Sequence, residues 1–419
     1  MARLLYKLAL LLLLPYIGLH LILRGRRQPE YLRHVGERFG FYPSRPDGAE
    51  RNIIWLHAVS VGETRAAQPL VAALLERYPD HRVLLTHMTP TGRQTSEELF
   101  GDRVLRVYLP YDYPFAVRRF LNRFRPRAGL IMETEIWPNL VAACHGRNIP
   151  LLLVNARLSE RSARRYARFA ALSRAALRQL TAIAAQGEGD AARLRALGAP
   201  RVEVFGNIKF DILPPAEQLA QGQTLRELIG ARRVLLAAST REGEEALILD
   251  ALAERPLHDA LLIVVPRHPQ RFDEVAVLIG RHGLRLQRRS EGLPLAAQTQ
   301  VLLGDSMGEM FAYYAACDVA FVGGSLLDYG SQNLIEACAV GAPVLIGRST
   351  FNFAAAAEQA IACGAARQVA DAGELLKVAG ALLRDEAARA GMGEAGKAFA
   401  ARHRGATAKT MELIARAMR

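Results

Sequence analysis

The chain has 419 residues, of which 51% are hydrophobic and 23% charged, a composition that excludes a disordered protein. Its length exceeds what one hydrophobic core usually serves, so we expect two domains. The net charge of +13 calls for an anionic partner. No zinc-finger or RNP-like pattern accompanies it, so we expect an anionic membrane surface or a phosphorylated lipid and no nucleic acid.

The four cysteines lie far apart and form no C-x-x-C pair. This spacing argues against a disulfide framework or a structural zinc site and favours a reducing compartment.

The segment from Leu4 to Leu23 is apolar apart from Lys7 and His20. Its 20 residues are close to the length of a membrane-spanning helix. Arg24, Arg26 and Arg27 follow at once, which predicts that the rest of the chain stays on the cytoplasmic side. No small-residue cleavage site follows, so we expect an anchor rather than a removed signal peptide. Pro15 and Lys7 leave a second interpretation open, a helix that lies in the membrane interface.

Two basic stretches, Phe115 to Arg127 and Arg161 to Arg178, are predicted to be helices. Each alone is typical of a solvated helix face. Because both fall in the same half of the chain as the apolar segment, we expect them to face anionic lipid.

Short apolar runs alternate with helix-period stretches along the rest of the chain, which predicts two doubly wound α/β halves with parallel sheets. The predicted strands of the first half are 53–57, 83–86, 129–132 and 151–154, and those of the second half are 234–237, 261–265, 301–303, 319–322 and 343–346. The predicted organisation is an anchor at 1–24, a first Rossmann-like domain at 25–205, a linker at 206–225, a second Rossmann-like domain at 226–385 and C-terminal helices at 386–419. Such halves bind ligands in the central cleft, at the carboxyl ends of their strands.

The run Ser60-Val61-Gly62-Glu63 follows the first predicted strand and precedes a helix. Its structural interpretation is a capping box, in which the glutamate satisfies a backbone N–H. In the functional interpretation Gly62 lets a ligand approach and Glu63 lies at the cleft as a base. The helix N-terminus is then expected to favour its ionised form.

Glu133 and Glu135 come directly after the strand 129–132. If that strand continues, alternation sends both side chains to one side. Buried carboxylates are costly unless they are paired or functional. A helix start near Pro138 explains one of them, hardly both.

Three polar clusters follow strands of the second half: Pro266 to Pro269, Gly304 to Glu309, and Gly323-Gly324-Ser325 through Gly330 to Glu336. Backbone N–H groups at Gly-rich helix starts hold phosphates, Arg267 can add bidentate contacts, and Glu336 can accept hydrogen bonds from ribose hydroxyls. Singly these are turns and caps, and together they predict a nucleotide site. No P-loop, no G-x-G-x-x-G, no D-x-D and no metal-ligand spacing occurs, so neither a metal nor a cofactor is expected.

These motifs closely resemble the 3-deoxy-D-manno-octulosonic acid (Kdo) transferases of lipid A biosynthesis in Gram-negative bacteria. The matching stretches are 24–26, 36–40, 57–63, 88–92, 108–112, 132–139, 155–159, 209–211, 265–269, 304–309, 323–325 and 350–353. They cover nearly the whole chain.

The resemblance implies a GT-B fold and transfer of Kdo from CMP-Kdo to a lipid A precursor at the cytoplasmic face of the inner membrane. A single carboxylate at Glu63 opposite the phosphate-type site predicts one displacement with inversion. It implies that Glu63 is the general base and that Glu133 and Lys209 assist at the transition state. The residues that it implies around CMP-Kdo are Pro266, Arg267, His268, Met307, Gly308, Glu309, Asn333, Leu334, Ile335 and Glu336.

The chain departs from the family pattern at Arg241, where a histidine is common, and at Ser331-Gln332-Asn333, which replaces Gly-His-Asn. Two other functions remain open, a nucleotide-sugar epimerase, which shares two Rossmann-like halves, and a membrane-bound sensor or scaffold that binds the donor without turnover. The predicted anchor argues against the first, and the two carboxylates Glu133 and Glu135 argue against the second.

Overall fold

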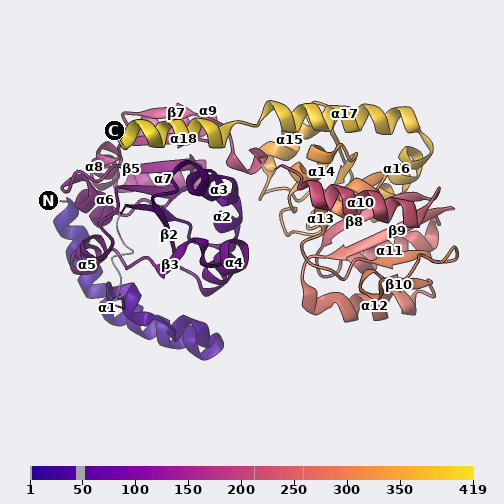
Figure 1. Cartoon of the computed structure of the whole chain (residues 1–419), viewed down its shortest axis with the longest axis horizontal. Helices are drawn as coiled ribbons and strands as arrows, with labels where there is room; N and C mark the ends of the chain where they lie inside the picture. The colour runs from indigo at the N-terminus through magenta and orange to yellow at the C-terminus, as the bar shows by residue number, and fades with distance from the viewer. Residues whose placement is uncertain (1, 44–51, 212, 258) are drawn as a thin grey trace. The chain divides into compact units, whose positions relative to one another are not determined.

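The computed structural model describes residues 2–43, 52–211, 213–257 and 259–419. Ile212, inside the predicted linker, and the side chain of Arg27 lie outside the described part. The chain forms two compact units: unit 1 comprises 1–211 and 403–419, and unit 2 comprises 212–402. The fold class expected from the sequence, two Rossmann-like α/β domains preceded by an apolar helix, is confirmed (Figure 1).

Unit 1 is built on a seven-stranded parallel sheet in the order β3-β2-β1-β4-β5-β6-β7. Its strands are β1 (Ile53–His57), β2 (Arg82–His87), β3 (Leu105–Tyr108), β4 (Ala128–Met132), β5 (Leu151–Ala156), β6 (Ala182–Ala185) and β7 (Val202–Val204). The four strands predicted from apolar runs are present. β3, β6 and β7 were not predicted, because they are short and less uniformly apolar.

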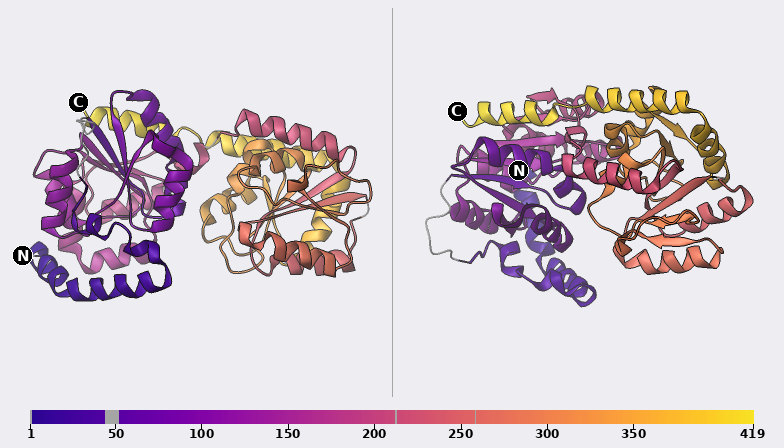
Figure 2. Two further views of the ribbon diagram at one scale, coloured as in Figure 1. Left: turned by 60° about the horizontal axis from the view of Figure 1, so that its bottom comes forward. Right: turned by 45° about the vertical axis from the view of Figure 1, so that its right-hand side comes forward.

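Helices cover both faces of this sheet, as Figure 2 shows. They are α2 (Val61–Ala66), α3 (Gln68–Arg77), α4 (Pro90–Phe100), α5 (Pro114–Phe124), α6 (Pro138–His145), α7 (Glu160–Arg168), α8 (Ala170–Gln179), α9 (Glu188–Ala196) and α18 (Ala406–Ala417), with short 3₁₀ turns η1 (Pro29–Leu32), η2 (Val35–Phe39), η3 (Gly101–Arg103) and η4 (Ile208–Asp211). The second predicted basic helix, 161–178, is in fact two helices. The chain leaves helical geometry at Phe169 (φ −115°, ψ 41°).

Alternating side chains of β1 pack on opposite faces of the sheet, as the pleat requires. Ile53 and Trp55 join one core cluster with Phe120 of α5, while Ile54 joins a second with Ile414 of α18. Burying each such side chain contributes roughly 1.5–3 kcal/mol. Both faces of β1 are therefore buried in the core, which explains its unbroken apolar sequence.

Helix α18, the last in the chain, belongs to unit 1. Asp211 at the end of η4 accepts hydrogen bonds from the backbone N–H groups of Gly405 (2.5 Å) and Thr407, and the rings of Phe210 and His403 stack at 4.8 Å. These contacts fasten η4 to the start of α18, so the segment that carries Lys209 is a fixed part of unit 1.

The N-terminal helix α1 (Ala2–Arg27) docks on unit 1. The hydroxyl of Tyr6 donates to a carboxylate oxygen of Asp112 at 3.1 Å, and that of Tyr113 donates to the carbonyl of Leu10 at 2.7 Å. Leu21, farther along, is buried. Ala2–Arg26 is long and apolar enough to cross a membrane, and among the described residues it is the only such helix.

Unit 2 repeats the architecture, with a parallel sheet in the order β10-β11-β9-β8-β12-β13-β14. Its strands are β8 (Arg233–Thr240), β9 (Ala260–Pro266), β10 (Leu286–Arg288), β11 (Val301–Leu303), β12 (Val319–Val322), β13 (Val344–Ile346) and β14 (Ala366–Gln368). Its helices are α10 (Ala216–Ile229), α11 (Glu244–Glu254), α12 (Phe272–Arg281), α13 (Met310–Ala316), α14 (Leu334–Val340), α15 (Ala354–Ala362), α16 (Ala372–Arg384) and α17 (Glu386–Arg402), with short 3₁₀ turns η5 (Pro269–Arg271) and η6 (Arg289–Glu291). The five predicted strands are present, and the edge strands β10 and β14 were missed.

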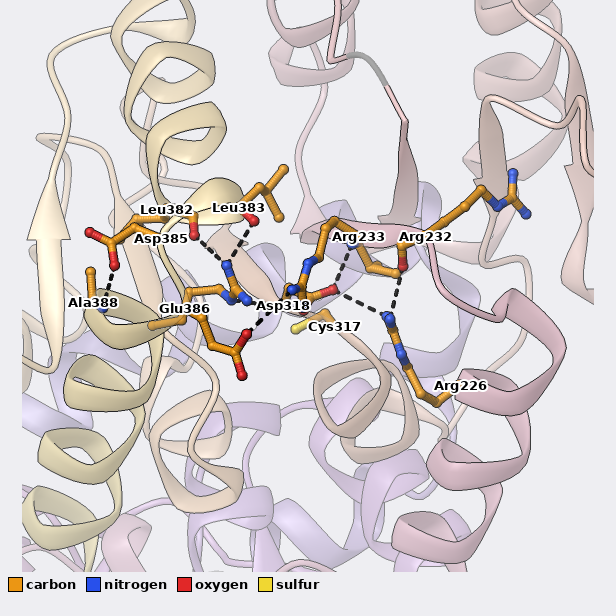
Figure 3. Close-up of polar contacts among 12 residues, drawn as sticks. Arg226, Arg232, Arg233, Cys317, Asp318, Leu382, Leu383, Asp385, Glu386 and Ala388 are labelled. Atoms are coloured by element: carbon orange, nitrogen blue, oxygen red, sulfur yellow. Dashed lines mark hydrogen bonds and ion pairs between the residues drawn. The ribbon is translucent and has the colours of Figure 1, made fainter.

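An arginine cluster around Asp318 lies at the amino ends of β8 and β12 in unit 2 (Figure 3). The Asp318 carboxylate lies 3.1 Å from guanidinium nitrogens of both Arg226 and Arg233 and 3.8 Å from Arg389, and it accepts the N–H of Val234 at 2.8 Å. The cluster lies at the sheet end opposite to the polar motifs. We therefore assign it to stability.

Asp318→Asn is expected to destabilise unit 2 by about 2 kcal/mol, because it removes the charge that three guanidinium groups share. Chemical denaturation of the full chain measures the change. Glu254→Gln, on the exposed end of α11, is the matched control and should change little. Equal stability of the Asp318 variant and the control would contradict the assignment.

Candidate active site

Each sheet reverses its strand order beside its first strand, between β1 and β4 in unit 1 and between β8 and β12 in unit 2. Ligands of doubly wound sheets bind outside the carboxyl ends of the strands at such switch points. Glu63 and Glu133 follow β1 and β4, while Arg241 and Gly323 follow β8 and β12. The topology thus brings the predicted residues of each unit to its switch point.

Glu63 stands in the first turn of α2, and its carboxylate caps a backbone N–H just before the helix. The reciprocal capping box does not form. Its carboxylate accepts the N–H of Val59 at 2.7 Å and the hydroxyl of Ser60 at 3.3 Å. The Ser60 side chain accepts no backbone N–H in return. The structural interpretation is therefore half right, and one carboxylate serves both as a cap and as a group near the switch point.

Burial raises the pKa of Glu63 from 4.5 to about 7. The Val59 N–H lowers it, the nearby charges of Glu133 and Glu135 raise it further, and the Ser60 hydroxyl lowers it slightly. The helix start was expected to favour the ionised form of Glu63, and the Val59 N–H does lower its pKa, but the net shift is upward. Desolvation and two like charges outweigh a helix of only six residues.

Glu133 and Glu135 do not continue β4, so the argument from strand alternation fails. The strand ends at Met132, and Glu133 adopts left-handed backbone geometry with φ 57°, which costs a non-glycine residue roughly 1–3 kcal/mol. The two carboxylates still lie near Glu63, as their effect on its pKa shows. Burial and the charge of Glu133 also raise the pKa of Glu135, opposed by the nearby indole N–H of Trp137, which lowers it.

Lys209 lies in the same cluster, with its Nζ 3.9 Å from Oε1 of Glu133. It stands on η4, whose first N–H, that of Ile208, donates to Oδ1 of Asn155 at 3.0 Å. In the sequence Asn155 stands out only as part of a family motif, and this role is not visible there. Its left-handed backbone (φ 51°) at the end of a buried strand cannot be read from a sequence.

Two buried histidines beside the switch point of unit 1 were also not assigned a role. Nδ1 of His57 lies 2.9 Å from Oγ1 of Thr86, and Nδ1 of His87 lies 2.8 Å from the carbonyl of Ala58. Burial lowers the pKa of His57 to about 3 and that of His87 to about 4. Both imidazoles are therefore neutral and hold the strand ends together.

In unit 2 the buried carboxylate of Glu244 organises the loop after β12. It accepts the backbone N–H groups of Gly324 (2.6 Å), Ser325 (2.9 Å) and Leu326 (2.9 Å), and that of Arg241 at 2.8 Å. The expectation that N–H groups of this Gly-rich loop hold phosphates is wrong for these three, since a carboxylate already occupies them.

Of the predicted donor residues, Pro266 ends β9, and Arg267 and His268 follow it. Nε of Arg267 donates to Oε1 of Gln332 at 3.2 Å, so one departure from the family pattern orients a predicted binding residue. Burial lowers the pKa of His268, as do the charges of Arg241, Arg267 and Arg271. This imidazole is therefore surrounded by guanidinium groups.

Among the remaining predicted donor residues, Asn333 caps α14 through the N–H of Ile335 (3.0 Å) and donates to Oε1 of Glu336 (3.0 Å). Leu334 and Ile335 are buried in the core, and the N–H of Ile335 is already bonded to Asn333, so neither residue presents a group to a ligand in this structure.

Met307 is exposed, and Gly308 adopts left-handed geometry with φ 82°. Glu309 lies 3.5 Å from Nε of Arg289. Unit 2 thus combines fixed caps with a few accessible polar groups.

Comparison with known proteins adds to this geometry. Residues 33–212 match the model of the 3-deoxy-D-manno-octulosonic-acid transferase (kdotransferase) family, and residues 237–399 match glycosyl transferases group 1. A 3-deoxy-D-manno-octulosonic acid transferase of Bordetella pertussis is 46% identical, with 99% of each chain covered. That of Haemophilus influenzae is 38% identical, covering 99% of this chain and 98% of its own.

Solved structures share the fold at low identity. A glycosyltransferase from Rickettsia africae superposes with a TM-score of 0.58 at 14% identity, covering 88% of this chain and 99% of that one. A UDP-GlcNAc 2-epimerase from Neisseria meningitidis gives the same score at 15% identity, with 87% and 100% covered. The fold alone therefore does not separate a transferase from an epimerase, whereas the full-length relatives do. The chain belongs to the 3-deoxy-D-manno-octulosonic acid transferases and is a glycosyltransferase.

Proposed function

We propose that this protein transfers Kdo from CMP-Kdo to a phosphorylated lipid A precursor, lipid IVA, and releases CMP, as a step of lipopolysaccharide core biosynthesis. The observation that carries the proposal is the cluster of Glu63, Glu133, Glu135 and Lys209 at the switch point of unit 1. A carboxylate whose pKa lies near 7 matches the requirement of a general base at neutral pH.

In this mechanism Glu63 takes the proton of a sugar hydroxyl on the acceptor as that oxygen attacks the anomeric carbon of Kdo. The bond from this carbon to the phosphate oxygen breaks on the opposite face, and CMP leaves with the electron pair. One displacement inverts the configuration. Lys209 neutralises charge on the leaving phosphate or the Kdo carboxylate, and Glu133, 3.9 Å from its ammonium group, holds it in place.

We also propose that the reaction needs no metal. In the described part of the chain, no group of three or more His, Cys, Asp or Glu side chains could hold a metal ion. Arginine side chains after β8 and β9 supply the positive charge that a donor phosphate requires.

The proposal places the enzyme at the cytoplasmic face of the inner membrane, attached through α1. The exposed apolar side chains of this helix include Leu4, Leu5, Leu8, Leu12 and Leu19. Because Tyr6 and Leu10 contact unit 1, the first half of the helix is held against the protein. These contacts favour a helix that lies in the membrane interface over one that crosses the bilayer.

The double substitution Leu8→Glu/Leu12→Glu is expected to shift the protein from vesicles of anionic lipid to the soluble fraction in a flotation assay. Two exposed leucines of α1 then no longer enter the lipid. Leu228→Glu, an exposed leucine of α10, is the control and should stay with the vesicles. Unchanged flotation of the α1 variant would contradict membrane attachment through this helix.

The activity itself is tested with purified enzyme, CMP-Kdo and lipid IVA, in the presence and absence of a chelator. We expect a lipid product heavier by Kdo, with inverted anomeric configuration by NMR and equal rates with EDTA. Release of a modified sugar from CMP-Kdo without lipid would instead indicate an epimerase. Donor binding without any product would indicate a sensor or scaffold.

A further inference from the structure

Arg241 stands at the switch point of unit 2, directly after β8. The N–H of the neighbouring Arg267 donates to the carbonyl of Thr240 at 2.9 Å, so the chain segments after β8 and β9 run side by side there. Gly324, in the loop after β12, lies against both departures from the family pattern: a Cβ built on it would be 3.0 Å from Nε2 of Gln332 and 3.5 Å from Cγ of Arg241.

The side chain of Arg241 is held in place on an aromatic ring. Its guanidinium carbon lies 4.6 Å from the centroid of the Tyr329 ring, within the range of a cation–π contact. The Tyr329 hydroxyl donates to the carbonyl of Glu242 at 3.2 Å, and the backbone N–H of Arg241 donates to Glu244. Ring, backbone and guanidinium therefore form one ordered unit, and no described residue accepts a hydrogen bond from the guanidinium.

Nearby carboxylates are engaged elsewhere. Glu244 accepts four backbone N–H groups, and Glu245 forms a bidentate pair with Arg271 at 2.8 and 3.0 Å. Within 213–257 and 259–419, no carboxylate forms an ion pair with Arg241. A half-buried arginine without an acidic partner, beside the guanidinium-surrounded His268, creates a local positive field that attracts an anion.

We infer that Arg241 binds an anionic group of the nucleotide-sugar donor. Tyr329 positions the side chain of Arg241, and Gln332 positions the side chain of Arg267. The inference rests on the proposed function and assigns a binding role to a residue at which the chain departs from its family. CMP-Kdo offers two anions, the phosphate and the sugar carboxylate. A planar guanidinium held in one orientation suits either, because both accept two parallel N–H donors.

The test compares Arg241→Gln with wild type by calorimetry of CMP-Kdo, CMP and cytidine, and by transfer kinetics. Loss of one charge-assisted contact predicts that the variant binds CMP-Kdo roughly 10- to 100-fold more weakly, with a raised KM and a nearly unchanged kcat. If the anion is the phosphate, CMP binding weakens equally and cytidine binding stays the same. If it is the carboxylate, only CMP-Kdo binding weakens.

Arg241→Lys keeps the charge and should recover part of the affinity. Arg281→Gln, an exposed arginine of α12, should bind all three compounds like wild type. Wild-type affinity for CMP-Kdo in Arg241→Gln would overturn this inference while leaving the transferase function intact. Equal weakening of cytidine would also overturn it, since cytidine carries no anion. Failure of the wild type itself to bind CMP-Kdo would overturn the proposed function together with the inference.

Discussion

Glu63→Gln is expected to lower the rate of Kdo transfer by roughly 10²- to 10⁴-fold, the usual contribution of a positioned general base. Glutamine keeps the shape of the side chain and one acceptor oxygen for the N–H of Val59, so the local fold should survive. It cannot take a proton from the acceptor hydroxyl. Single-turnover kinetics with saturating donor measures the chemical step directly.

The matched control for this substitution is Glu76→Gln, on the exposed face of α3, which should transfer at the wild-type rate. CMP-Kdo affinity should be unchanged in both variants, because the mechanism gives neither side chain a contact with the donor. Near wild-type transfer by a folded, donor-binding Glu63→Gln protein would remove Glu63 from the mechanism.

The same substitution is expected to stabilise the protein at alkaline pH. The pKa of Glu63 is raised from 4.5 to about 7 in the fold, so the folded state holds this proton more tightly than the unfolded chain. The stability that this bound proton contributes is complete below pH 4.5 and is lost as the pH rises through 7. At pH 8 the glutamine variant should be more stable, by on the order of 2 kcal/mol, and at pH 4 equally stable.

Glu244→Gln is expected to be the most damaging single substitution in the donor-binding unit. The carboxylate serves four backbone N–H groups, and a carboxamide offers one oxygen to them and turns an NH₂ group toward the others. Each buried donor left without an acceptor costs about 1–3 kcal/mol. We expect unit 2 to lose roughly 3 kcal/mol and the KM for CMP-Kdo to rise at least about tenfold, as the loop after β12 shifts.

Denaturation of the full chain and donor calorimetry measure both effects. Glu242→Gln, two residues away and exposed, is the control and should behave like wild type. Equal stability and donor affinity of the Glu244 variant would show that the loop after β12 does not depend on this carboxylate.

The central strands of both sheets could be predicted because they are buried on both faces and therefore apolar throughout, as in Ile53–His57. The edge strands could not. β7 (Val202–Val204) is only half-buried, and β10 (Leu286–Arg288) carries polar residues, so neither shows a continuous apolar run. Pairing with a neighbouring strand, which no local pattern records, makes them strands.

The candidate site was predictable as far as its residues follow central strands. Glu133 stands directly after β4 and Glu63 in the helix that follows β1, and alternation of strands and helices is enough to bring them to one edge. Their protonation was not predictable, because the pKa of Glu63 depends on burial and on the charges of Glu133 and Glu135. The prediction that strand alternation sends Glu133 and Glu135 to one side was wrong, because Glu133 adopts a left-handed backbone conformation and does not continue β4.

The roles of the supporting residues could not be predicted for a different reason. In the sequence Glu244 stands in the first turn of a helix, where acidic residues are common, yet it accepts N–H groups about 80 residues away. Asn155 lies inside a buried strand and fixes the turn that carries Lys209. Such long-range contacts follow only from the assembled fold.

The pH dependence of single-turnover Kdo transfer tests the central claim most directly. With saturating CMP-Kdo and lipid acceptor, the rate of the wild type should rise with pH through an apparent pKa near 7 and then level off, as Glu63 loses its proton. In Glu63→Gln the residual rate should lack this inflection. A wild-type rate that is constant from pH ~5.5 to ~8.5, or an unchanged inflection in the variant, would contradict Glu63 as the base.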